Sequence, residues 1–482
     1  ANAGAPLRCR LFLLMHISAN LQTSTCTRAH HDGTSLHCES VVVAAIDTLE
    51  VLMRMTFTLI AMIPVPTQSL CHSPPSHRVA GRACEDRFRR QAGPLAGRDG
   101  RTGVVRWLAH LARAAGLAIL LTACAPSKHL YVAPDGNDSN PGSKSAPFST
   151  IARADAAAAP GFTIHVAPGT YEVSAPGLLS AGITTQRSGT PSERIKFVSD
   201  VKWGAKIVVS GIGIAWRSKG SHVDIEGFDI SGTGRMGILA DGANLTITNN
   251  LVHDLTVSGG CNGNGGAAID TNGGPGNVLI KGNVVRNIGV DMRGSCRTVQ
   301  GIYIANPHNV VVNNVVSGVA AVGIQQWHGA TDSTIVNNTV FHCKIGILIG
   351  SGDSGVLPNG SQNNYVANNI VYDNITYGIV ESGKVGVNNR YVDNLVHASG
   401  LAIRAKGEVS GTITADPQFV DYRADGSGDY RLKRTSPALK AASIHAAAAT
   451  VPAQGQAPAH AAQALRDVPP QLGAYLGSAV AD

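Results

Sequence analysis

Short apolar runs separated by polar turns recur along the middle of the chain. One example is GNVLIKGNVVRN, from Gly276 to Asn287, and HNVVVNNVVSG and STIVNNTVFHC repeat its pattern. Each unit has an Asn before two apolar residues, and this marker falls at Asn250, Asn283, Asn314, Asn338, Asn369 and Asn394. Subtracting these position numbers gives steps of 33, 31, 24, 31 and 25 residues. A Gly before an apolar strand is the second marker, at Gly237, Gly266, Gly301, Gly323, Gly346 and Gly378.

A repeat of this length predicts a solenoid. The apolar runs are too short for helices and lack the 3.6-residue period, so the pattern favours an all-β parallel β-helix. Its coils would stack about 4.8 Å apart. An Asn at the same corner of every coil can then hydrogen-bond its neighbours and satisfy a buried polar corner. Asn also tolerates the left-handed backbone that a tight corner needs, so we assign the repeated Asn a structural role.

Two insertions interrupt the repeat at the same corner of consecutive coils, at Thr256–Gly265 and Ile288–Gln300. They contain Cys261 and Cys296, which could form a disulfide in an oxidising compartment. Insertions on one face of a repeat fold often mark the binding face. A third insertion, SGDSGVLPNGSQ, leaves a different corner.

Composition narrows the class of protein further. The chain has 55 glycines, 5% aromatic residues and 15% charged residues, which is typical of many short strands and tight turns. The net charge of +7 is modest. No basic stripe is interleaved with aromatic residues, so we expect no nucleic-acid partner. We expect a monomer.

The N-terminal region reads differently from the repeat. Residues 1–103 hold five of the nine cysteines and show no sustained period. We interpret them as unstructured or as upstream sequence translated from an early start; a genuine disordered or membrane-associated extension is the alternative. Residues 104–124 have two arginines, a short apolar run and LTAC, which resembles a bacterial lipobox with Cys124 as the lipidated residue. We therefore expect an exported lipoprotein of the bacterial cell envelope, attached to the membrane only through its lipid, or a secreted protein.

The two ends of the remaining chain carry a family resemblance. Tyr131–Val173 contains turn signals, a short helix STIARADAAAA with Ser149 as N-cap, and the strands TIHVAPGTYEV. This opening, with SGTPSERIKFVSD, KWGAKIV, the segment from Asp416 and VPPQLGAYL, resembles bacterial right-handed parallel β-helix proteins, notably pectate lyases of polysaccharide lyase family 9. The resemblance implies an N-terminal cap and first coils over 125–204, coils over 205–400 and a closing segment and tail over 401–482.

Outward positions of the Gly-marked strands indicate a binding site. With the glycines aligned, Asp241 and Asp270 stack on adjacent coils, since strand side chains alternate. Two such carboxylates need a cation between them, and oxygen ligands suit Ca²⁺, with Asp291 as a third. We expect substrate contacts from the neighbouring outward and inserted residues Arg293, Tyr303, Gln325, Trp327 and His328.

The resemblance implies a pectate lyase-like enzyme that cleaves an acidic, uronate polysaccharide by Ca²⁺-assisted β-elimination. Family members use an Asp cluster for Ca²⁺ and a Lys as base. Because no Lys is expected on the outward face here, Arg297 is the candidate base, with Asp270 beside it and Arg293 on the carboxylate. Three alternatives remain open. Asp241 and Asp270 could serve a glycoside hydrolase. NPHN, Asn306 to Asn309, is similar to an epimerase motif but has Asn in place of Asp. A non-catalytic glycan-binding surface protein is the third.

Overall fold

The structure is a computed structural model that describes residues 128–257, 260–290, 295–352 and 356–439. Several sequence predictions lie outside these residues. They are the extension over 1–103, the signal and lipobox over 104–124 with Cys124, the final VPPQLGAYL, and the site residues Asp291 and Arg293.

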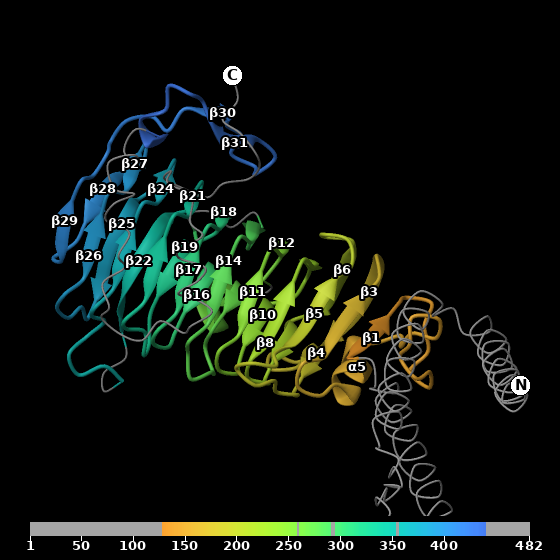
Figure 1. Ribbon diagram of the computed structural model, residues 1–482. Coiled ribbons are helices and arrows are strands. Elements are labelled where there is room, and N and C mark those ends of the chain that lie inside the picture. The colour runs from red at the N-terminus through yellow and green to blue at the C-terminus, as the bar shows by residue number, and fades with distance from the viewer. Residues whose placement is uncertain (1–127, 258–259, 291–294, 353–355, 440–482) are drawn as a thin grey trace, which may run out of the picture. The chain divides into compact units, whose positions relative to one another are not determined.

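Three parallel sheets make up the described chain (Figure 1). Sheet 1 consists of β1 (His129–Val132), β2 (Thr163–Val166), β5 (Ile195–Ser199), β8 (Val223–Glu226), β11 (Thr246–Thr248), β14 (Leu279–Lys281), β17 (Val310–Val312), β20 (Thr334–Val336), β23 (Tyr365–Ala367), β26 (Arg390–Val392) and β29 (Glu408–Ser410). Sheet 2 consists of β3 (Gly169–Ala175), β6 (Ala205–Gly211), β9 (Asp229–Gly232), β12 (Leu251–Leu255), β15 (Val284–Ile288), β18 (Val315–Val319), β21 (Thr339–Phe341), β24 (Ile370–Tyr372) and β27 (Leu395–His397).

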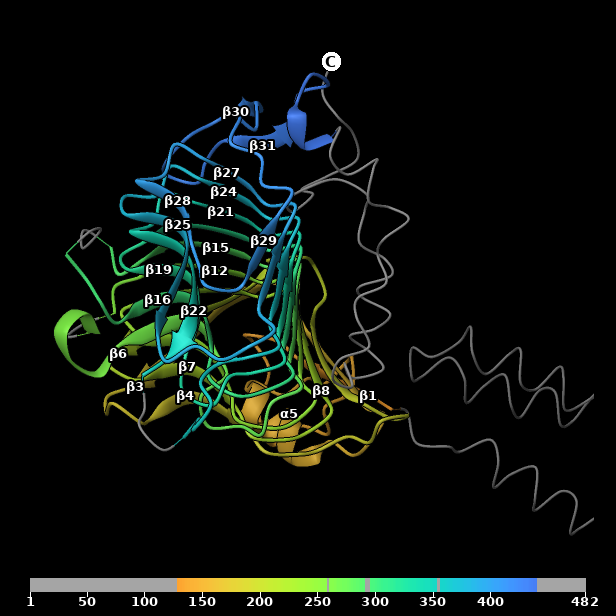
Figure 2. The ribbon, with the colours of Figure 1, turned by 90° about the vertical axis from the view of Figure 1, so that its left-hand side faces the viewer.

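Sheet 3 carries the Gly-marked strands. It consists of β4 (Ala181–Thr185), β7 (Ile214–Ser218), β10 (Met236–Ala240), β13 (Gly266–Asp270), β16 (Val299–Ile304), β19 (Val322–Gln326), β22 (Ile345–Ser351), β25 (Tyr377–Gly383) and β28 (Leu401–Arg404). Between the two ends of the stack, each coil contributes one strand to each sheet, and the strand pairs with its equivalent on the next coil (Figure 2). The prediction of an all-β parallel β-helix is confirmed.

Stacked apolar side chains fill the interior of the coils. In sheet 1, the strands from β8 to β26 each bury an inward-pointing residue that stacks on its equivalent in the next coil: Ile225, Ile247, Ile280, Val311, Ile335, Val366 and Tyr391. Trp216 is fully buried in the early coils, in edge-to-face contact with Phe197 and Phe228. Burial of such columns of aliphatic side chains is the main source of stability in the fold.

The corner between sheets 1 and 2 holds the predicted Asn ladder. The backbone N–H and the side-chain amide of Asn283 both donate to Oδ1 of Asn314, at 2.9 and 3.0 Å. The same pair of bonds links every neighbouring pair of the ladder Asn250, Asn283, Asn314, Asn338, Asn369 and Asn394. The left-handed backbone falls on the residue before each of these, for example Asn313 with φ of 57° and Gly282 with φ of 67°. The Asn ladder is therefore confirmed. The ladder Asn makes the hydrogen bonds, whereas the residue before it adopts the left-handed backbone of the corner.

A short helix, α5 (Ile151–Ala157), packs against the first strands of the stack. Thr150 is its N-cap, since the Thr150 hydroxyl accepts from the Arg153 N–H at 3.1 Å. The predicted cap, Ser149, is therefore wrong by one residue. Ser149 instead donates to the Asp138 carboxylate, which also accepts from Thr150 and so ties the cap to the preceding loop.

The C-terminal segment adds two more coil strands before it forms a hairpin. Leu401–Ser410 still forms the regular strands β28 and β29, so the coils extend past 400. The antiparallel hairpin β30 (Phe419–Asp421) and β31 (Asp429–Leu432) then packs its aromatic side chains on the outer face of sheet 2, against Phe341 and Tyr372. In the described part of the chain, the helices are too short or too polar to cross a membrane.

Candidate functional site

A row of outward side chains on sheet 3 forms the floor of the candidate site. The register pairs Leu239 with Asp270, Asp270 with Tyr303, Tyr303 with Gln325 and Gln325 with Leu348. The predicted stacking of Asp241 on Asp270 is therefore wrong. Ala268, and not Gly266, occupies the Gly-marker position of this coil. Ile269, the next residue, pairs with Ile238 and Ile302, which directly follow the markers Gly237 and Gly301. Aligning the glycines shifted this one coil by two residues.

A cavity of about 610 Å³ lies over this floor. We call it the groove. One wall comes from the two insertions, Gly263–Gly266 and Cys296–Gln300. The opposite wall includes Asn272, which follows β13, and Trp327 and His328, which follow β19. The predicted residues Asp270, Arg297, Tyr303, Gln325, Trp327 and His328 all line the groove.

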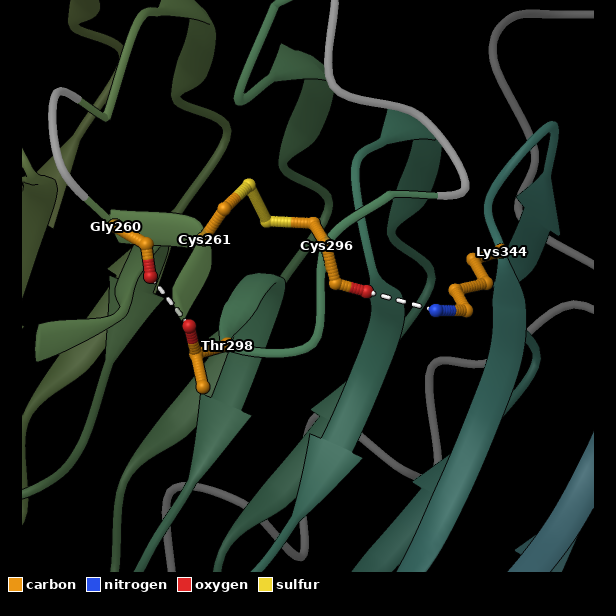
Figure 3. Close-up of a disulfide and its surroundings, with 5 residues drawn as sticks. All are labelled: Gly260, Cys261, Cys296, Thr298 and Lys344. Atoms are coloured by element: carbon orange, nitrogen blue, oxygen red, sulfur yellow. Dashed lines mark hydrogen bonds between the residues drawn. A yellow bond between two sulfur atoms is a disulfide. The ribbon is translucent and has the colours of Figure 1, made fainter. Parts of the chain in front are cut away.

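The insertion wall carries three cations, Arg235, Arg297 and Lys344, which we call the cation wall. A disulfide joins Cys261 to Cys296, as the sequence predicted, and thereby ties the two insertions together (Figure 3). Lys344 Nζ donates to the Cys296 carbonyl at 3.0 Å. The Thr298 hydroxyl donates to the Gly260 carbonyl across the same junction (Figure 3).

The same junction also holds the guanidinium of Arg235, whose Nε donates to the Gly265 carbonyl at 3.1 Å. The backbone N–H of Arg297 donates to the Cys261 carbonyl at 3.4 Å, and its side chain is exposed. Burial lowers the pKa of Arg235, and the nearby Asp270 partly offsets this effect. The disulfide-linked insertions therefore hold positive charge against one side of the groove.

Asp270 is the titratable group of the floor. Its side chain is 2% exposed, and Oδ1 accepts from the Asn272 N–H at 2.7 Å. Burial raises the pKa of Asp270 to about 7, because a desolvated carboxylate is costly. The Asn272 hydrogen bond and the charges of Arg235 and His328 lower this pKa, whereas Asp241 raises it. A carboxyl group with a pKa near neutrality can accept or donate a proton at ordinary pH.

Aromatic side chains stand at the opposite wall. The rings of Tyr303 and His328 meet edge to face, with their centroids 5.6 Å apart. Trp327 is half-buried and packs beside Tyr303 and Ala305. The groove therefore has cations on one side, aromatic rings on the other and a titratable carboxyl group on its floor.

The described residues do not fit the expected Ca²⁺ site. Asp241 forms an ion pair with Arg217, whose Nε lies 2.5 Å from Oδ2, and does not line the groove. Asp270 stands between Leu239 and Tyr303, neither of which offers a carboxylate. Among the described residues, no three His, Cys, Asp or Glu side chains are grouped so that they could hold a metal ion. We derive no step through Ca²⁺.

Sequence reasoning missed Arg235 and Lys344. Both stand two residues before a Gly marker, Gly237 and Gly346, at the corner from which the insertions leave. Alternation along the strand does not assign a side to such corner residues. The available signal was a long cationic side chain at the same offset from the marker on two different coils.

The fold and groove can now be compared with known proteins. Residues 130–273 match the family model described as Pel9A-like, right handed beta helix region. The match supports the predicted right-handed coil and covers the first coils of the stack. A curated relative, the uncharacterized protein YwoF of Bacillus subtilis (strain 168), is 34% identical over 87 residues. That stretch is 18% of this chain and only 16% of YwoF.

The chain also aligns with solved structures, to different degrees. The crystal structure of pectate lyase Pel9A aligns with a TM-score of 0.50 and 17% identity, over 64% of this chain and 90% of that one. A rhamnogalacturonan lyase aligns at 0.45 and 16% identity, over 64% and 96% of the two chains. The GH136 lacto-N-biosidase from Eubacterium ramulus aligns at 0.39 and 14%, over 65% and 69%. The family match and the Pel9A alignment give the chain a Pel9A-like right-handed β-helix fold. Fold alone does not decide the reaction.

Proposed function

We propose that the protein is a polysaccharide lyase that cleaves a uronate polysaccharide in the groove by β-elimination. One observation carries the proposal: the cation wall of Arg235, Arg297 and Lys344 faces a floor whose carboxyl group, Asp270, has a pKa of about 7. Cations on one side suit the carboxylate of a uronate. A base poised near neutral pH on the floor suits abstraction of the proton beside that carboxylate.

The proposed reaction uses the residues in three roles. Arg297 and Lys344 bind and neutralise the uronate carboxylate, which acidifies the adjacent C5–H bond. Ionised Asp270 accepts the C5 proton, the released electron pair forms the C4–C5 double bond, and the C4–O bond breaks. The leaving oxygen takes its proton from the hydroxyl of Tyr303, the residue paired with Asp270. Arg297, expected from the sequence as the base, is assigned to the carboxylate because a guanidinium is a cation with no lone pair to offer.

The alternatives receive less support. A glycoside hydrolase of the usual kind needs two carboxyl groups across the bond, and among the described lining residues Asp270 is the sole carboxyl group. Asn306 and Asn309 are buried and hydrogen-bonded to each other and to the Thr271 and Gly274 carbonyls. These bonds give both residues a structural role at a corner of the coil, which does not favour an epimerase. A non-catalytic glycan-binding protein would bind the polysaccharide without forming product, which the assay below distinguishes.

The experiment is an ultraviolet assay for unsaturated uronate product on polygalacturonate and on alginate, with and without added Ca²⁺. We expect product from the wild-type protein and a loss of at least about 100-fold with Asp270→Asn, because general-base catalysis contributes about that much. Lys196→Gln is the charge-removal control, since Lys196 is exposed on sheet 1 away from the groove. Release of reducing sugar without unsaturated product would replace the lyase by a hydrolase.

We also propose that the protein works outside the cytoplasm. The Cys261–Cys296 disulfide at the groove supports this, because such bonds persist in oxidising compartments. The lipid anchor at Cys124 remains part of the same proposal, and labelling of the cells with a radioactive fatty acid would test it.

A further inference from the structure

The indole ring of Trp327 lies on a surface made by glycines. A Cβ atom built on Gly352 would meet three ring atoms of Trp327, Cζ2, Cε2 and Nε1, at 2.2, 2.7 and 2.9 Å. A Cβ on Gly383 would lie 2.9 Å from Cη2, and one on Gly350 would lie 3.2 Å from Cζ3. Any larger residue at Gly352 would therefore push the ring away. We call Gly350, Gly352 and Gly383 the glycine bed.

The glycine bed fixes the direction of the ring. Trp327 follows β19, Gly350 is in β22 and Gly383 ends β25, so the ring extends across the next two coils. One side of the indole contacts the bed, while Trp327 also lines the groove. A flat aromatic surface held in this way is a suitable platform for an apolar sugar face, because it loses little conformational freedom on binding.

The surroundings of Trp327 differ from the Asp270 end of the groove. Leu348 on the floor and Ser382 beside the ring line this end. Arg235 directly precedes β10, and Asp270 ends β13. Asp270 therefore lies three coils before β22. Three strand spacings are roughly 14 Å, which exceeds the length of one monosaccharide. The groove therefore extends over more than one sugar. Lys344 precedes β22, but its Nζ reaches back to the Cys296 carbonyl before β16, so Leu348 and Ser382 make the lining beside Trp327 uncharged.

We propose that Trp327 and the glycine bed form a second, uncharged subsite that binds the sugar next to the uronate by its apolar face. The groove then takes polysaccharides in which a uronate adjoins a neutral sugar in preference to a uniform polyuronate. This inference rests on the proposed function for the uronate position, but stacking on Trp327 can be measured without turnover. Gly352 is a positioning residue, because it acts only through the ring.

Calorimetric binding to the full chain tests the subsite with two oligosaccharides of equal length. One alternates galacturonate with rhamnose, and the other is oligogalacturonate. We expect wild-type protein to bind the alternating oligosaccharide more tightly. Trp327→Ala should lower that affinity roughly ten-fold, the scale of a well-packed aromatic contact, and should lower oligogalacturonate affinity less.

A double-mutant comparison separates positioning from general damage. Gly352→Ala should weaken binding of the alternating oligosaccharide, whereas Gly352→Ala added to Trp327→Ala should cause no further loss in affinity or in melting temperature. Gly329→Ala is the matched control, since its Cβ would make ordinary contacts at 3.5 and 3.6 Å. If Gly352→Ala weakens binding equally with and without Trp327, the positioning role is wrong.

Failure of the subsite and failure of the lyase proposal have different signatures. If Trp327→Ala leaves the affinity for the alternating oligosaccharide unchanged, or if wild-type protein prefers oligogalacturonate, the subsite is wrong whatever product forms. If the affinity losses appear but no unsaturated product is formed from any uronate polymer, the subsite stands and the lyase proposal falls.

Discussion

At the scale of single residues, Asp270 makes a prediction about stability as well as chemistry. Its folded-state pKa of about 7 lies above the ordinary value of 3.8, so ionisation is unfavourable in the folded protein. Stability is therefore lost as pH rises from about 4 to about 7. Asn at this position keeps an acceptor for the Asn272 N–H and carries no charge. We expect Asp270→Asn to be neutral near pH 4 and stabilising above pH 7, by at most roughly 4 kcal/mol.

Urea unfolding at several pH values measures this difference. Glu172→Gln serves as the control, because Glu172 is exposed on β3 and removal of its charge should give no such trend. A stability difference for Asp270→Asn that stays constant from pH 4 to pH 8 would show that Asp270 ionises as freely in the folded as in the unfolded protein.

The groove residues could be predicted where strand alternation fixes a side or where an insertion marks the binding face, as for Arg297. Tyr303, Gln325 and Asp270 were found because outward positions repeat every second residue. The neighbour of Asp270 on the preceding coil was predicted wrongly as Asp241. The alignment took Gly266 as the Gly marker, whereas Ala268 occupies that position. The corner cations Arg235 and Lys344 were missed, since their directions depend on the insertions that they contact.

At the scale of elements, the Asn ladder is expected to dominate local stability. Asn314→Ala would leave the Asn283 N–H without its acceptor and the Ile280 carbonyl without its donor inside a buried corner. Because each unsatisfied buried group costs about 1–3 kcal/mol, we expect a loss of at least about 2 kcal/mol. Asn359→Ala, at an exposed turn, should change the free energy of unfolding by about 0.5 kcal/mol or less. Equal effects of the two changes in urea unfolding would contradict the structural role of the ladder.

The disulfide-linked insertions form a second element with a measurable effect. Cys261 and Cys296 are 35 residues apart, and closing a loop of that length in the unfolded chain stabilises the fold by about 3–4 kcal/mol in the chain-entropy model. We therefore expect a reducing agent to lower the melting temperature of the wild-type protein. The double variant Cys261→Ser, Cys296→Ser should melt lower without reductant and should not respond to it. If the double variant melts at the same temperature as the oxidised wild-type protein, the disulfide does not stabilise the fold.

Repeated elements explain why the fold was predictable. The spacing of Asn250 to Asn394 and the short apolar runs between them specify strand length, corner and coil from sequence alone. The C-terminal hairpin was not predictable in the same way. Phe419 and Tyr430 do not share the repeat, and only their contacts with Phe341 and its neighbours place them on the side of sheet 2.

At the scale of the whole molecule, the β-helix acts as a rigid support for a groove that crosses several coils. Sheet 3 supplies the floor, the tied insertions and the corner residues that contact them supply the cation wall, and the corner after β19 supplies Trp327 and His328. Each of these parts comes from a different coil, so their spacing is set by the strand spacing of the solenoid. A long polymer that lies along such a groove meets charge, a titratable carboxyl group and an aromatic platform in turn.

The pH dependence of unsaturated-product formation tests the central claim most directly. We predict that kcat/KM on a uronate polymer rises with pH through a midpoint near 7, because Asp270 must be ionised to accept the proton. Asp270→Asn should abolish this rising limb of the pH profile together with most of the activity. The same limb persisting in Asp270→Asn, or no unsaturated product at any pH on any uronate polymer, would contradict the account.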